Sequence, residues 1–93
     1  MKDHQRVTIL VHGRVHGVFF RDSTMRKARE LGLKGTVQNL PDGTVLIAAQ
    51  GPVHDLDALI RWAHEGPPAA IVREVQVTYE TPGDDWEDFR ILF

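Results

Sequence analysis

Residues 12–21 of the chain read HGRVHGVFFR and connect a predicted strand to a predicted helix. The strand is indicated by the alternation of Val7, Ile9 and Val11 with residues that face the other side. The two glycines of the stretch permit the backbone to curl, so that successive N–H groups converge into an anion-binding nest. The start of the helix adds unpaired N–H groups and the positive end of its dipole. The sequence therefore predicts a phosphate-binding loop.

Arg21 stands where the helix is expected to begin, with Asp22 or Ser23 as the N-cap. Its guanidinium carries a planar fork of donors that matches phosphate oxygens. Taken alone, an arginine at this position is usually a solvated surface residue, and the helix dipole slightly disfavours it. The glycine loop, together with the longer sequence pattern described below, favours a phosphate-binding role.

Hydrophobic periodicity and turn residues predict the remaining elements. The first helix runs to about Leu31 and ends at Gly32, and a hairpin follows, with strands Thr36–Leu40 and Thr44–Gln50 joined by residues 41–43. A second helix opens at Gly51-Pro52 and ends at Gly66, a long strand covers Ala70–Tyr79, a polar loop covers Thr81–Glu87, and Phe89, Ile91 and Phe93 mark a short last strand.

This order, βαββαβ plus a short C-terminal strand, predicts one α+β domain over residues 1–93. Its simplest fold is a ferredoxin-like split βαβ, an α/β sandwich. Two helices then pack on one face of a mostly antiparallel sheet, and right-handed crossovers place the first and fourth strands side by side.

The composition excludes several classes of function. The 93 residues are 42% hydrophobic and 26% charged with a net charge of −2, which argues against a surface built for nucleic acid or anionic membranes. The outer sides of the first and fourth strands also lack the aromatic platform that RNA-binding modules use. The absence of cysteine is compatible with a reducing compartment. We therefore expect a cytoplasmic protein with no nucleic-acid partner and no membrane partner.

Asn39 is the second candidate site residue, because strand alternation places it on the same face as Val37, toward the helices. A buried amide without a partner costs about 1–3 kcal/mol. The side chain both accepts and donates, so beside a phosphate it can hold a water molecule for in-line attack. An asparagine two residues before Pro41-Asp42-Gly43 is equally typical of a turn former. The residues alone leave both interpretations open.

The five histidines do not indicate a metal site. His12 and His16 are four residues apart, but they lie on a strand and a loop, where this spacing does not bring them together. His54 and His64 are ten residues apart on the second helix, nearly three turns along it. The sequence predicts neither a metal ion nor a cofactor.

Four longer motifs surround the candidate residues. They are GRVHGVFFR at 13–21, ARELGLKGTVQN at 28–39, DGTV at 42–45 and GP at 51–52. In their order and spacing, over nearly the whole chain, they resemble the acylphosphatase family. The resemblance implies a hydrolase that cleaves the carboxyl–phosphate bond of acyl phosphates without a metal. Its partners would be the small-molecule acyl phosphate substrate and the inorganic phosphate product, and we expect a monomer.

The resemblance also assigns roles to the residues. Arg21 would bind the phosphoryl group and Asn39 would orient the attacking water, whose proton would pass to the substrate. The phosphate-binding backbone amides would be those of Val15, His16, Gly17, Val18, Phe19 and Phe20. The alternative is a domain of the same fold that binds phosphate or another ligand without catalysis.

Two positions depart from the family pattern. His16 stands where glutamine is usual, and Thr36 stands where tryptophan is common. Because the loop works through backbone amides, we expect activity to survive the His16 exchange with altered affinity or stability, and an imidazolium at this position would favour an anion. We expect Thr36 to loosen the hairpin, because it removes a large packing group.

Overall fold

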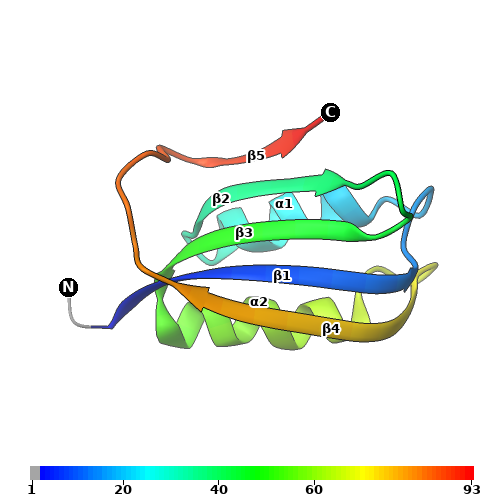
Figure 1. Ribbon diagram of the computed structural model, residues 1–93, viewed down its shortest axis with the longest axis horizontal. Helices are drawn as coiled ribbons and strands as arrows, with labels where there is room; N and C mark the ends of the chain where they lie inside the picture. The colour runs from blue at the N-terminus through cyan, green and yellow to red at the C-terminus, as the bar shows by residue number, and fades with distance from the viewer. Residues whose placement is uncertain (1–2) are drawn as a thin grey trace.

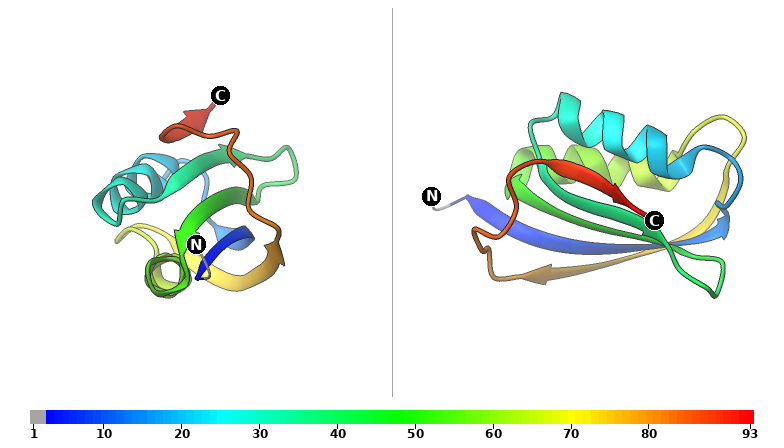
Figure 2. Two further views of the ribbon diagram at one scale, coloured as in Figure 1. Left: turned by 90° about the vertical axis from the view of Figure 1, so that its left-hand side faces the viewer. Right: turned by 90° about the horizontal axis from the view of Figure 1, so that it is seen from above.

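The computed structural model describes residues 3–93, which form two helices and one sheet of five strands (Figure 1). The elements in chain order are β1 His4–Arg14, α1 Phe20–Glu30, β2 Lys34–Asn39, β3 Val45–Pro52, α2 Val53–Glu65, β4 Ile71–Glu80 and β5 Phe89–Leu92. Both helices cover the same face of the sheet, as the view from above in Figure 2 shows. The predicted ferredoxin-like α+β fold is confirmed.

The strands lie in the order β4-β1-β3-β2-β5. β1 pairs in antiparallel fashion with both β3 and β4, which confirms the predicted adjacency of the first and fourth strands. β2 is antiparallel to β3 and parallel to β5. The sequence pattern predicted a last strand but did not say which strand it would join.

One hydrophobic core fills the space between the helices and the sheet. The fully buried side chains of the strands and of α2 are Val7, Ile9, Val11, Val37, Val45, Ile47, Ala49, Leu56, Leu59, Ala63 and Phe89. From α1 the buried residues are Phe20, Thr24 and Ala28, and the Thr24 hydroxyl donates to the Phe20 carbonyl oxygen at 2.7 Å. Met25 and Leu31 pack only at the margin of this core.

α1 begins earlier than the sequence pattern predicts. Its first residue is Phe20 and its N-cap is Phe19, so the prediction of Asp22 or Ser23 as the cap is wrong. Asp22 lies in the first turn instead, where it forms an ion pair with Arg26 at 2.9 Å. The bulk of Phe20 decides the difference, because the earlier start carries this ring into the core.

The connection between β4 and β5 is attached to the sheet face opposite the helices through Arg6. Arg6 Nε donates to Gln50 Oε1 at 2.9 Å, and the guanidinium carbon lies 3.8 Å from the centroid of the Trp86 ring. A second guanidinium nitrogen forms an ion pair with Asp85, which lowers the pKa of that carboxyl below its ordinary value of 3.8. Gln50 in turn donates to the Gly83 carbonyl oxygen. These contacts fix the segment that leads into β5.

We expect Arg6→Leu to lower Tm by roughly 4–8 °C, the shift that a loss of about 1 kcal/mol produces in a domain of this size. Leucine keeps aliphatic bulk but loses the hydrogen bond to Gln50 and the cation–π contact with Trp86. The contribution from Asp85 is present above its unfolded-state pKa of 3.8 and is lost as pH falls through its lower folded-state pKa. Thermal unfolding followed by circular dichroism at neutral pH measures the loss of Tm in Arg6→Leu. The same measurement below pH 3.8 shows how much of that loss depends on ionised Asp85.

Arg90→Leu is the matched control, because Arg90 is exposed and its carboxylate partner is the nearby Asp88. We expect its Tm to stay close to that of the unmodified protein. Equal shifts in the two variants would contradict the role assigned to Arg6.

Candidate active site

The corner between β1 and α1 is built from residues in left-handed backbone conformations. Gly17 has φ 71° and Phe19 has φ 63°, with Val18 between them. Val15 and Phe20 at the two ends of the corner are buried and anchor it in the core. The five backbone N–H groups of residues 16–20 find no acceptor in the described part of the chain. Unpaired N–H groups in such a turn form a concavity that binds anions.

The conformation of Phe19 is strained. A left-handed conformation costs roughly 1–2 kcal/mol for a residue with a side chain. The Phe19 side chain is 81% exposed, so core packing does not offset this cost. Its carbonyl oxygen accepts from Ser23 N–H at 3.0 Å, in the first turn of α1. A strained residue at the edge of a cavity is typical of a functional site.

His16 connects this corner to the β2–β3 hairpin. Its Nε2 lies 2.8 Å from the Thr44 carbonyl oxygen, to which it donates. The turn of the hairpin is fixed by Asp42, whose Oδ1 accepts from Thr44 N at 3.0 Å and from Thr44 Oγ1 at 2.6 Å. These two bonds hold the pKa of Asp42 below its ordinary value. The His16 side chain therefore positions the hairpin end against the loop, a contact that the sequence pattern did not predict.

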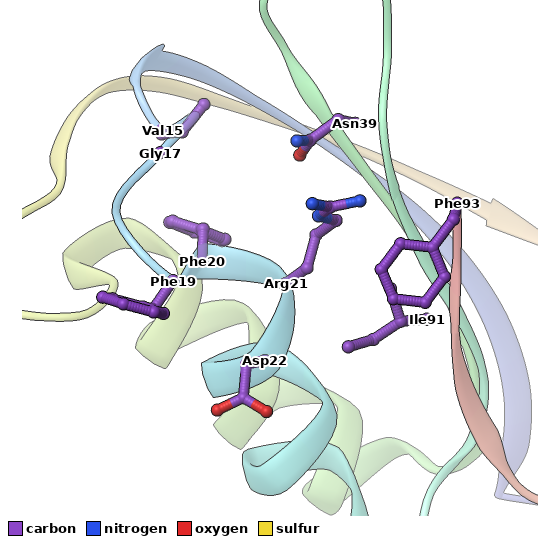
Figure 3. Close-up of a pocket in the computed structure, with 9 residues that line it drawn as sticks. All are labelled: Val15, Gly17, Phe19, Phe20, Arg21, Asp22, Asn39, Ile91 and Phe93. Carbon is purple, nitrogen blue, oxygen red and sulfur yellow. The ribbon is translucent and has the colours of Figure 1, made fainter.

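Arg21 and Asn39 face each other across a cavity (Figure 3). Arg21 extends from the first turn of α1, and Asn39 is the last residue of β2, paired with Val45. Asn39 Oδ1 is buried and accepts no hydrogen bond from residues 3–93. Over the same residues, no hydrogen bond or ion pair engages the Arg21 guanidinium. The Arg21 guanidinium and the Asn39 amide oxygen can therefore both bind a ligand that lies between them.

The cavity has a volume of about 540 Å³. Its lining residues are Val15, Gly17, Phe19, Phe20, Arg21, Asp22, Asn39, Ile91 and Phe93. Of the residues predicted from sequence, the structure brings six to this cavity, while His16 and Val18 belong to the loop without lining it.

Three lining residues were not predicted. The sequence pattern predicts Asp22 as a helix cap and predicts Ile91 and Phe93 only as residues of a strand, whereas all three line the cavity. The Arg21 guanidinium carbon lies 5.1 Å from the centroid of the Phe93 ring. The alternation of Phe89, Ile91 and Phe93 shows that these side chains share a face, but no sequence signal shows that β5 pairs with β2.

The described histidines do not form a metal site. His12 is hydrogen-bonded to Gln76, and His64 to the carbonyl oxygen of Ile60. Within residues 3–93, no three His, Asp or Glu side chains converge in a way that would hold a metal ion. The same residues include no helix with the length and apolar character needed to cross a membrane.

Comparisons with known proteins agree over almost the whole chain. The acylphosphatase family model matches residues 7–91. An acylphosphatase from Anaeromyxobacter dehalogenans is 47% identical over 93 residues, covering 100% of both chains. The solved structure of an acylphosphatase from Coxiella burnetii has a TM-score of 0.92 and 40% identity, covering 98% of this chain and 95% of that one. The solved structure of an acylphosphatase from Bacillus subtilis has a TM-score of 0.92 and 32% identity, covering 96% of this chain and 99% of that one. The resemblance inferred from the sequence motifs is confirmed, and the chain belongs to the acylphosphatase family.

Proposed function

We propose that this chain hydrolyses the carboxyl–phosphate bond of acyl phosphates, giving a carboxylate and inorganic phosphate. One observation carries the proposal: unpaired donors and an unpaired amide oxygen meet at a single cavity. The donors at the cavity are the Arg21 guanidinium and the N–H groups of Gly17, Phe19 and Phe20, and the oxygen is Asn39 Oδ1. The unpaired N–H groups of His16 and Val18 belong to the same loop.

In the proposed reaction the loop amides and Arg21 hold the phosphoryl group. Phosphoryl transfer spreads negative charge over the three equatorial oxygens, and preorganised donors stabilise that charge. The left-handed residues Gly17 and Phe19 aim the N–H groups before the substrate arrives, so no donor has to be rearranged during the reaction. Arg21 supplies a full positive charge with a geometry suited to two oxygens at once.

Asn39 positions the attacking water. Its unpaired Oδ1 accepts one O–H of the water, and its NH₂ group can donate to the phosphoryl group or to the water oxygen. The water oxygen forms a bond to phosphorus while the bond from phosphorus to the acyl oxygen breaks. The electron pair of the broken bond leaves on the carboxylate, and the proton of the water passes to a phosphoryl oxygen. The reaction balances without a side-chain base or a metal ion.

A domain that only binds phosphate is the alternative. Such a domain needs the donors of the loop and of Arg21, but an acceptor oxygen facing them adds little to the binding of an anion whose oxygens are themselves acceptors. The position of Asn39 therefore favours hydrolysis.

The proposal also covers the oligomeric state, the location and the partners of the chain. Residues 1–93 act as one domain and as a monomer in the cytoplasm, with the acyl phosphate and inorganic phosphate as partners and with no nucleic acid or membrane. The absence of cysteine supports the reducing compartment, and the net charge of −2 argues against nucleic-acid and anionic-membrane partners. Gel filtration with light scattering tests the monomer directly.

We expect Arg21→Ala to lower kcat/KM for benzoyl phosphate by about 10²–10³-fold, the loss seen when one preorganised donor to a developing oxyanion is removed. The assay follows hydrolysis with excess chelator present, and the unmodified protein should keep its full rate. Arg61→Ala, which removes an exposed arginine of α2 outside the cavity, is the control and should change kcat/KM by less than about twofold. Retained kcat/KM in Arg21→Ala would remove Arg21 from the mechanism, and loss of turnover in chelator would show that a metal is needed.

We expect Asn39→Ala to lower kcat by roughly 10²-fold with little change in KM, because a water-orienting group acts mainly in the transition state. Steady-state kinetics with benzoyl phosphate measures both constants. Gln38→Ala removes the neighbouring amide, which points to the opposite face of β2, and should leave both constants unchanged. A rise in KM at constant kcat would instead make Asn39 a binding residue.

A further inference from the structure

The cavity is larger than the reacting group requires. A water molecule occupies about 30 Å³ in the liquid, so a volume of about 540 Å³ exceeds a phosphoryl group and one water several-fold. The volume lies within the range of pockets that hold whole organic ligands. Space therefore remains beside the phosphate corner for the part of the substrate that leaves.

The lining of that remaining space is apolar and aromatic. Ile91 and Phe93 stand on one side of Arg21, and Phe19 stands on the other (Figure 3). Phe93 is 100% exposed. Phe19 is also exposed, although its backbone is strained. Asp22, the anionic residue of the lining, is already paired with Arg26. Exposed aromatic surface beside a cationic donor is suited to an anion with an apolar body.

The position of Phe93 is determined by the sheet. β5 pairs in parallel with β2 up to Gln38 and Leu92, so Phe93 follows directly at the end of β2 that carries Asn39. Alternation along β5 turns Phe93 to the same side as the buried Phe89, toward α1. The Arg21 guanidinium carbon lies 5.1 Å from the ring centroid, so the ring stands beside the donor fork.

We propose that Phe93, with Ile91, forms a wall that packs against the acyl group of the substrate. The wall makes the protein select acyl phosphates with aromatic or bulky apolar acyl groups over those with small ones. This inference rests on the proposed hydrolysis and adds the class of acyl group to it. Binding energy from such a remote contact acts at the reacting centre, so it raises kcat/KM for the bulky substrate.

The test compares benzoyl phosphate with acetyl phosphate in the unmodified protein and in Phe93→Ala. We expect the unmodified protein to prefer benzoyl phosphate, and Phe93→Ala to lower kcat/KM for it about tenfold while kcat/KM for acetyl phosphate changes less than about twofold. Phe93→Leu keeps an apolar wall without a ring over Arg21 and should retain most of the preference. Leu92→Ala is the control, because Leu92 lies on the same strand and faces away from the cavity.

If Phe93→Ala and Phe93→Leu each lowered kcat/KM equally for both substrates, the ring would act through Arg21. That result would overturn the proposal that Phe93 packs against the acyl group. An unchanged preference would overturn it as well. Binding of phenylphosphonate and methylphosphonate, measured by calorimetry, separates this inference from the proposed hydrolysis. A Phe93-dependent preference for phenylphosphonate supports the wall even if no substrate is turned over, an outcome that would overturn the hydrolysis alone.

Discussion

The site depends on backbone N–H groups that the fold leaves unpaired at the corner between β1 and α1. Gly17 adopts its left-handed conformation without a steric cost, whereas Phe19 is strained in the same conformation. Together they shape a turn whose N–H groups, those of residues 16–20, have no acceptor among the described residues and can bind an anion. The ends of the corner are held by Val15 and Phe20 in the core. This rigidity matters because a cradle that had to rearrange would lose the electrostatic advantage of preorganisation.

The register of the sheet supplies the rest of the site. β3 lies between β1 and β2, and its pairing with both places the end of β2 beside the corner that follows β1. The bond from His16 to the Thr44 carbonyl oxygen, at 2.8 Å, then joins the loop to the hairpin and so relates the phosphate donors to Asn39. On the other side, the contacts of Arg6 with Gln50 and Trp86 hold the segment that brings β5 alongside β2. The Arg6 contacts, on the sheet face opposite the helices, thus hold the segment that brings Ile91 and Phe93 to the cavity.

Much of this arrangement can be predicted from the sequence. Alternating residues such as Val7 and Ile9, the spacing of Leu56 and Leu59, and the turn residues give the order of elements and the fold, because these patterns are local. Arg21 and Asn39 are identified by their motifs. The earlier start of α1 was missed, because the gain from burying Phe20 outweighs capping by Asp22, and that gain depends on tertiary packing. Phe93 was missed because the pairing of β5 with β2 joins segments about fifty residues apart, which no local signal specifies.

The most direct test is a crystal structure with orthovanadate, which takes the trigonal bipyramidal shape expected of phosphorus during in-line attack. The equatorial oxygens should accept from the N–H groups of residues 16–20 and from Arg21, and an apical oxygen should lie within hydrogen-bonding distance of the Asn39 amide. Vanadate bound at another place on the protein would contradict the phosphate cradle. Vanadate bound in the loop with Asn39 turned away from the apical oxygen would contradict the oriented water.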